Sequence, residues 1–186
     1  MAIAGLVALS TRLWLVRHGA TDWSDAERLT GWTNVPLNER GRVQAQVLGR
    51  AMAGRKFAGI WSSDLERAAE TARVAVGGAI PDRRLRELNF GDLDGCTWDQ
   101  CPPEIREELL AFDRFAAPGG ESVEALRERV LDFLARLSPG DHLVFTHGGV
   151  VRLLLRAVGH YARIPPGGLV EVAWPDQRLG GPSAAV

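Results

Sequence analysis

The sequence has no apolar run approaching the roughly 20 residues that a membrane-spanning helix needs. Its first nine residues are apolar, but no basic segment precedes them, which argues against a secretory signal peptide. The two cysteines, Cys96 and Cys101, are too few for a disulfide framework or a complete cysteine metal site. We therefore expect free thiols in a reducing compartment, and a soluble, cytoplasmic protein that does not bind a membrane.

Lysine is almost absent from the chain. Of the 22 basic residues only Lys56 is a lysine, and the 23 acidic residues bring the net charge to −1. A chain with no net positive charge lacks the field that general nucleic-acid binding requires. The arginines are of interest one by one, because a guanidinium group holds phosphate or carboxylate through paired hydrogen bonds.

The length of 186 residues predicts one domain with a full hydrophobic core. We expect this domain over residues 1–186, with its core at about 12–174 and peripheral or frayed ends at 1–10 and 178–186. Predicted strands alternate with predicted helices, which favours an α/β fold with a central, mostly parallel sheet flanked by helices on both faces. The strands are expected at 12–16, 59–61, 83–88, 142–146 and 169–174, and the helices at 38–53, 65–76, 98–115, 122–137 and 150–158.

Two histidines, His18 and His147, each follow a short apolar strand and precede a glycine. The carboxyl ends of parallel strands meet at one edge of a sheet, where open α/β sheets bind ligands. Arg17 stands beside the first histidine, Glu87 lies at the third predicted strand, and Arg67 lies in the first turn of the helix after the second strand. We therefore expect these five side chains to gather at one edge.

Two arginines, two histidines and one carboxyl group have the chemistry of phosphoryl transfer without a metal. Neutral imidazole is a nucleophile at neutral pH, since its unperturbed pKa is about 6.5. Arginines neutralise the nonbridging phosphoryl oxygens, and a carboxylic acid can protonate the departing oxygen. Gly148 and Gly149 open a predicted helix whose N-terminal dipole favours an anion. The expected partner is a small phosphate ester.

Five ordered segments between about Leu13 and Val158 resemble the motifs of the histidine phosphatase superfamily, also called the phosphoglycerate mutase-like family. The first is LVRHGAT at 15–21 followed by TGWTNVPL at 30–37, and the others are SSDLERAAETA at 62–72, LRELNFG at 85–91, PGGES at 118–122 and FTHGG at 145–149. Arg-His-Gly alone would be a weak signal, whereas five motifs in order are highly specific. The resemblance implies a single α/β domain with a mostly parallel sheet.

The resemblance also implies a role for each matching residue. His18 would be the nucleophile that becomes phosphohistidine, and Glu87 would be the general acid and then the general base. Arg17, Arg67 and His147 would hold the phosphoryl oxygens. Further candidates for contacts with the substrate are Ser24, Thr30, Gly31 and Gly148. A phosphatase of this kind would need no metal or cofactor, a mutase would need 2,3-bisphosphoglycerate, and the oligomeric state stays open, a homodimer included.

The chain departs from the family pattern at several positions. The family usually has Glu or Gln where this chain has Ala20, and often Asn where it has Ser24. Mutases usually have Tyr in place of Phe90 and Asn in place of Gly149, and they carry a longer, basic insertion after the third motif. These differences direct attention to the short segment 96–117, which we expect to cover the site.

Segment 96–117 holds more acids than bases. Its acids are Asp99, Glu104, Glu107, Glu108 and Asp113, and its arginines are Arg106 and Arg114. An acidic cover is poorly suited to a bisphosphorylated intermediate, because like charges raise the cost of binding. We therefore expect a phosphomonoester hydrolase. The alternatives are a 2,3-bisphosphoglycerate-dependent phosphoglycerate mutase and a non-catalytic phospholigand-binding module, which would be expected to have lost His18 or Glu87.

Other interpretations of these residues stay open at the level of the sequence. The two histidines could be core residues or metal ligands, although no matched acidic pair and no His-x-x-x-His spacing supports a metal site. Asp92 and Asp94 compete with Glu87 for the role of the acid. The tryptophans Trp23 and Trp32 could line a substrate pocket or simply pack in their loop.

Overall fold

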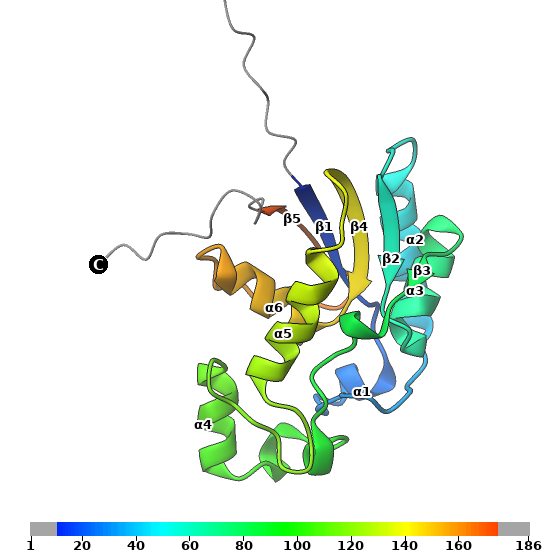
Figure 1. Cartoon of the computed structure of the whole chain (residues 1–186). Helices are drawn as coiled ribbons and strands as arrows, with labels where there is room; N and C mark the ends of the chain where they lie inside the picture. The colour runs from blue at the N-terminus through cyan, green and yellow to red at the C-terminus, as the bar shows by residue number, and fades with distance from the viewer. Residues whose placement is uncertain (1–10, 175–186) are drawn as a thin grey trace, which may run out of the picture.

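The computed structural model describes residues 11–174, which form a single α/β domain. In this part of the chain a five-stranded sheet has the order β3-β2-β4-β1-β5 (Figure 1). The strands are β1 (Thr11–Arg17), β2 (Gly59–Ser62), β3 (Ile80–Pro81), β4 (Gly140–Thr146) and β5 (Leu169–Trp174). The first four run parallel, and β5 runs antiparallel to β1. The mostly parallel sheet predicted from the sequence is confirmed.

Helices cover both faces of this sheet (Figure 1). On one face lie α5 (Val123–Leu134) and α6 (Gly148–Ala157), and on the other lie α2 (Glu39–Met52) and α3 (Glu66–Val76). The connections near the carboxyl ends of the strands contain the shorter α1 (Asp22–Asp25) and α4 (Pro103–Ala111) and three turns of 3-10 helix, at Arg83–Leu85, Gly91–Leu93 and Trp98–Gln100. No helix among residues 11–174 is long and apolar enough to cross a membrane.

The side chains of β1 alternate between two hydrophobic cores. Leu13 and Leu15 belong to the core under α5 and α6, whereas Trp14 and Val16 belong to the core under α2 and α3. Because both faces of the strand are buried, it is apolar at four successive positions rather than at every second one. Packing on both sides fixes the point where β1 ends and its polar residues begin.

The prediction of a strand at 83–88 is wrong. The third strand is the two-residue β3, and a turn of 3-10 helix follows it. The Asp82 side chain caps this turn by accepting a hydrogen bond from the Arg84 backbone N–H at 2.9 Å, and such local bonding competes with strand pairing. Three backbone carbonyl groups, one in the turn and two beyond it, accept hydrogen bonds from the Arg129 guanidinium. The segment that carries Glu87 is therefore a loop held by a side chain.

The helix expected at 98–115 is two separate pieces, the 3-10 turn at Trp98–Gln100 and α4. Cys101 and Pro102 separate them, because each precedes a proline and proline disfavours helical backbone at the residue before it. Phe112 ends α4 with a positive φ of 70°. The last predicted helix begins at Gly148, two residues before the predicted start. The predicted frayed ends, 1–10 and 178–186, lie outside the described residues.

Candidate active site

His18 and His147 meet at the carboxyl edge of the sheet. The neighbouring strands β1 and β4 are in register from Thr11 opposite Gly140 to Arg17 opposite Thr146, so the two histidines follow side by side. The His18 backbone N–H donates to the Thr146 carbonyl at 2.9 Å. The two imidazole rings lie edge to face, with centroids 5.2 Å apart. The parallel pairing of two strands thus brings together residues that are far apart in the sequence.

The hydrogen bonds of His18 fix which ring nitrogen can react. Its Nδ1 lies 2.8 Å from the Gly19 carbonyl oxygen, which can only accept, so Nδ1 carries the proton. Nε2 of the neutral ring therefore has a free lone pair. Burial, followed by the positive charge of Arg67, holds the pKa of His18 well below 6.5. The His18 imidazole is consequently uncharged at neutral pH, with Nε2 free to accept.

Several buried polar atoms around His18 have no hydrogen-bond partner among residues 11–174. They are Nε of Arg17, Nε of Arg67 and both ring nitrogens of His147. Buried polar groups are nearly always satisfied, so such a cluster indicates a ligand site. Burial also holds the pKa of His147 well below 6.5, with Arg67 as the next largest cause. The two guanidinium nitrogens, together with the one ring nitrogen of neutral His147 that carries its proton, are donors of the kind expected around a phosphoryl group.

Arg67 projects from α3 and is fully buried. Its Nη1 donates to the Thr33 carbonyl at 3.0 Å, and its Nη2 donates to the carbonyls of Gly31 at 2.6 Å and Thr30 at 3.3 Å. Burial lowers the pKa of Arg67 to about 10, so the guanidinium stays charged at neutral pH. The backbone of Thr30 and Gly31 therefore positions Arg67, and Thr30 also lines the hollow described below.

Arg17 occupies the last position of β1 and is held in a similar way. Its Nη1 donates to the Ile164 carbonyl at 2.9 Å, in the segment between α6 and β5. Burial lowers its pKa, which is opposed by the negative charge of Glu87. Gly148, at the start of α6, lies close by, because a Cβ built on it would be 3.4 Å from Arg17 Nε. Backbone carbonyls thus fix both arginines while part of each guanidinium remains without a partner.

Glu87 is buried, and its carboxylate rests on the first turn of α6. The Gly149 N–H donates to Oε2 at 2.9 Å and to Oε1 at 3.1 Å, and the Leu88 N–H donates to Oε1 at 2.8 Å. A Cβ built on Gly149 would overlap Oε1 and lie 3.1 Å from the Glu87 Cδ. The absence of a side chain at Gly149 is therefore what lets the carboxylate approach the helix.

The backbone of Glu87 is fixed by two side chains. The Trp32 Nε1 and the Arg129 Nη2 each donate to the Glu87 carbonyl at 2.8 Å. Arg129 forms two further hydrogen bonds with the Glu121 carboxylate, whose Oε2 also accepts from the Asn89 N–H. The sequence reasoning did not identify Arg129. The Pro-Gly-Gly-Glu-Ser motif was the available signal, because its glutamate binds this arginine.

Other predicted residues have structural contacts. The Ser24 hydroxyl forms a capping box with Thr21 at the start of α1, although Ser24 also lines the hollow. Asp94 accepts hydrogen bonds from the loop N–H groups of Gly31 and Thr33 and from the Thr33 hydroxyl. Asp92 is exposed. Of the three acids that competed at the level of the sequence, Glu87 is the one that lines the hollow beside His18.

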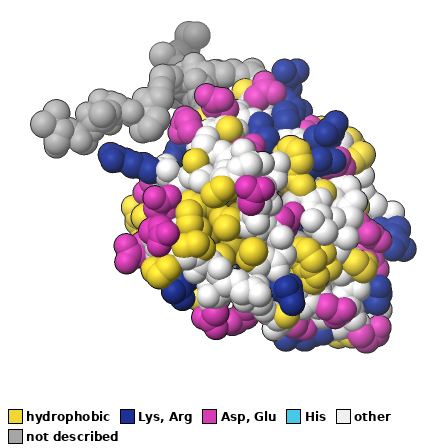
Figure 2. Space-filling model, turned by 90° about the horizontal axis from the view of Figure 1, so that it is seen from below, with side chains coloured by type: hydrophobic (Ala, Val, Ile, Leu, Met, Phe, Trp, Pro, Cys, Tyr) yellow, Lys and Arg dark blue, Asp and Glu magenta, His cyan; other side chains and the backbone are white. Residues whose placement is uncertain are grey.

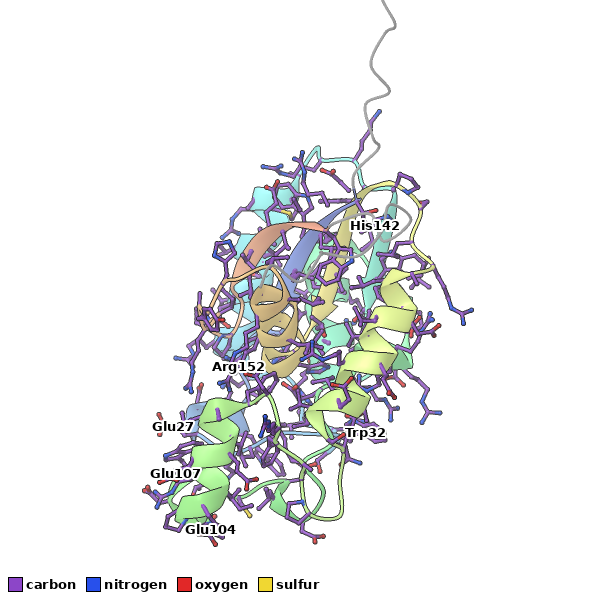
Figure 3. The ribbon with its side chains drawn as sticks, turned by 60° about the vertical axis from the view of Figure 1, so that its left-hand side comes forward. Glu27, Trp32, Glu104, Glu107, His142 and Arg152 are labelled. Carbon is purple, nitrogen blue, oxygen red and sulfur yellow. The ribbon has the colours of Figure 1, made fainter. Side chains whose placement is uncertain are left out.

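A hollow of about 510 Å³ opens beyond Arg17 and His18. Its charged lining consists of Arg17, Arg28, Arg152, Arg163, Glu27 and Glu87, and its apolar lining of Leu29, Phe90, Trp98 and Leu109. Figure 3 shows Glu27 and Arg152 beside α4, close to this opening. Figure 2, which looks at the molecule from below, shows apolar side chains gathered near the middle of that face and no visible histidine. The histidines of the site are therefore covered on this face.

The prediction that an acidic cover faces the ligand is wrong. None of the five acids of segment 96–117 lines the hollow. Glu104 and Glu107 lie on the outer side of α4 and point away from the body of the protein (Figure 3). The side of the cover that faces the site instead supplies apolar residues such as Leu109 and Trp98. Helical periodicity explains this result, since α4 turns its acids to solvent and Leu109 inward.

Residues 11–174 contain no cluster of three or more His, Cys, Asp or Glu side chains that could hold a metal ion. The unpartnered donors at the site suit an anion rather than a cation. The electrostatics and geometry therefore fit an anionic ligand beside an uncharged imidazole.

Comparisons with known proteins agree with this geometry. Residues 13–167 match the model of the histidine phosphatase superfamily (branch 1). The chain is 37% identical over 161 residues to the adenosylcobalamin/alpha-ribazole phosphatase of Escherichia coli, covering 80% of this chain and 79% of that one. It is 33% identical over 161 residues to a metal-independent phosphoserine phosphatase of Arabidopsis thaliana, covering 77% and 67%. A crystal structure of phosphoglycerate mutase from Thermus thermophilus superposes with a TM-score of 0.83 at 46% identity, over 88% of this chain and 94% of that one.

Proposed function

The chain belongs to branch 1 of the histidine phosphatase superfamily, whose members are phosphatases or phosphoglycerate mutases, and from this premise we propose that it hydrolyses a small phosphomonoester without a metal ion. The observation that carries the proposal is the neutral His18, with Nε2 free, among buried donors that lack protein partners. We expect the enzyme to act in the cytoplasm, since Cys96 and Cys101 are both free thiols.

The first half of the reaction transfers the phosphoryl group to His18. Nε2 attacks phosphorus, and the bond from phosphorus to the ester oxygen breaks. Glu87 is the general acid of this step and gives a proton to the departing oxygen, so the product leaves as an alcohol. Arg17, Arg67 and His147 donate hydrogen bonds to the nonbridging oxygens, where negative charge must be balanced in the transition state.

The second half of the reaction releases phosphate. The Glu87 carboxylate takes a proton from water, whose oxygen attacks phosphorus and breaks the bond from phosphorus to Nε2. The contacts of Glu87 with the N–H groups of Leu88 and Gly149 hold its carboxylate beside the site for this step. His18 returns to its neutral form with the proton still on Nδ1, and Glu87 regains the proton that it gave away.

The size and exposure of the hollow support hydrolysis over mutase activity. A volume of about 510 Å³ is within the range of roughly 300–1,000 Å³ typical of sites for larger ligands, so a three-carbon acid would leave room for water. Three residues of its lining, Glu27, Arg28 and Arg163, are exposed to solvent. A mutase must keep water away from its phosphoenzyme, and a wide, solvent-exposed hollow suits a hydrolase better.

One observation favours the mutase as the second candidate. Four arginines line the hollow, against two glutamates, so a bisphosphorylated ligand would meet a positive surface. With the acids of α4 turned to solvent, repulsion by the cover no longer argues against this ligand. A mutase would require 2,3-bisphosphoglycerate as its cofactor. The non-catalytic module ranks last, because His18 and Glu87 are both present at the site.

The test is turnover of 4-nitrophenyl phosphate in the presence of a chelator. We expect the wild-type protein to be active and His18→Ala to lose activity by roughly a thousandfold or more. The matched control is His160→Ala, which removes an exposed histidine outside the site. Equal turnover by wild type and His18→Ala would refute the assignment of the nucleophile. Interconversion of 2- and 3-phosphoglycerate that needs 2,3-bisphosphoglycerate and outpaces hydrolysis would establish the mutase instead.

A further inference from the structure

A second, smaller hollow of about 160 Å³ adjoins the one beside His18. The two hollows share five lining residues, namely Arg17, Phe90, Leu109, Arg152 and Arg163. Arg17 is also one of the arginines expected at the phosphoryl group. A substrate whose phosphoryl group sits on His18 could therefore extend its leaving group into the smaller hollow.

The smaller hollow has three arginines and no aspartate or glutamate among its lining residues. Glu27 and Glu87 line the larger hollow only. The rest of the smaller lining is apolar side chains and glycine backbone, from Phe90, Leu109, Phe112, Ala162, Ile164, Gly148 and Gly149. A space whose lining side chains are either arginines or apolar groups suits a flat apolar group that carries an anion.

The three arginines differ in how far the protein itself occupies them. Arg17 donates to the Ile164 carbonyl. Arg152 donates to the carbonyls of Leu109 and Leu110 at the end of α4, and its guanidinium lies 4.4 Å from the centre of the Phe112 ring. Its role is to attach the cover to α6.

Arg163, by contrast, has neither an ion pair nor a side-chain hydrogen bond within residues 11–174. It is exposed at the opening, yet close enough to act on both neighbours. The pKa values of Arg17 and Arg152 are each lowered mainly by burial, and the charge of Arg163 lowers both further. Arg163 is therefore the guanidinium in this hollow that is available to a ligand.

We propose that the smaller hollow is a subsite for a carboxylate on the leaving group. Arg163 is the residue that selects this carboxylate. The preferred substrates are phosphomonoesters of bulky, flat alcohols or phenols that bear it. This inference rests on the proposed function. A guanidinium group binds a carboxylate through two parallel hydrogen bonds, and the apolar walls bury the ring that carries it.

The test compares phenyl phosphate with 4-carboxyphenyl phosphate, which differ by one carboxylate. In the wild-type enzyme we expect kcat/KM to favour the carboxylated ester by about fivefold, near the upper end for an exposed ion pair. Arg163→Gln should bring the ratio close to one, and Arg163→Lys should keep part of it. The matched control, Arg114→Gln, removes an exposed arginine that lines neither hollow and should keep the wild-type ratio. A ratio that Arg163→Gln leaves unchanged would overturn the proposal.

A binding measurement separates this inference from the proposed function. If wild type hydrolyses neither ester, the proposed function fails. Calorimetric titration of both esters into His18→Ala then tests the subsite without any turnover. Tighter binding of the carboxylated ester that is lost in His18→Ala/Arg163→Gln supports the subsite, whereas equal affinity for the two esters in His18→Ala refutes it.

Discussion

Replacing Gly149 by alanine should displace the Glu87 carboxylate and leave the fold in place. The new Cβ would overlap Glu87 Oε1 and lie 3.1 Å from Cδ, so one of the two groups must move. The Gly149 backbone belongs to the first turn of α6, whereas the carboxylate is the end of a flexible side chain. We therefore expect Glu87 to move away from the helix and lose its bonds to the N–H groups of Gly149 and Leu88.

The size of the effect on stability and on activity follows from these contacts. Hydrogen bonds to a charged group contribute about 1.5–3 kcal/mol each to stability, and this contribution is lost. Two effects offset the loss: the displaced carboxylate can be solvated in the adjoining hollow, and alanine favours the helix over glycine by up to about 1 kcal/mol. We expect the free energy of unfolding to fall by less than about 3 kcal/mol. Because a positioned general acid contributes roughly 10²–10⁴ in rate, we expect kcat/KM for phenyl phosphate to fall about a hundredfold.

The assay compares phenyl phosphate with 4-nitrophenyl phosphate, since kcat/KM reports the steps up to departure of the phenol. Phenolate is the poorer leaving group and depends more on protonation, so its ester should suffer the larger loss in Gly149→Ala. The control, Gly148→Ala, places a Cβ 3.4 Å from Arg17 Nε, an ordinary contact, and should cause a smaller loss that is equal for both esters. Equal losses for the two esters in Gly149→Ala would refute the role of Glu87 as proton donor.

Two further predictions concern stability. Burial lowers the pKa of both His18 and His147, so below about pH 6.5 the unfolded chain takes up protons that the folded chain does not. The stability that the two neutral histidines contribute is complete above pH 6.5 and is lost as the pH falls. Between pH 7 and 5, Tm should therefore decline less in His18→Gln than in wild type. Equal slopes of Tm against pH in the two proteins would contradict this prediction. Arg129→Met should lower the free energy of unfolding by about 2–4 kcal/mol in urea titrations, because it leaves the Glu121 carboxylate without its ion-pair partner. Arg127→Met, which breaks an exposed ion pair on the same helix, should cost less than about 1 kcal/mol, and similar losses in the two variants would refute the special role of Arg129.

Hydrophobic patterning was sufficient to predict the strands that carry the histidines. The run at 13–16 is apolar on both faces, as expected of a parallel strand between two layers of helices, and glycine marks the point where each strand ends. Pattern failed at 83–88, where Asp82 and Arg129 satisfy the backbone in place of a neighbouring strand. The prediction also failed at 98–115, because a count of charges along the segment does not tell in which direction each side chain points.

The sequence by itself determined the α/β class, the mostly parallel sheet and the two strand ends that carry His18 and His147, because these depend on local periodicity and on motifs that are contiguous along the chain. Only the tertiary structure decided which nitrogen of His18 is free, how Gly149 admits the Glu87 carboxylate and how Arg129 fixes the loop. It also showed that the acids of α4 face solvent while Arg163 faces a hollow. The bond between His18 and Gly19 is local but depends on how the ring is turned, and the other features depend on packing between residues distant in sequence. No pattern along the chain records the distance or direction of such contacts.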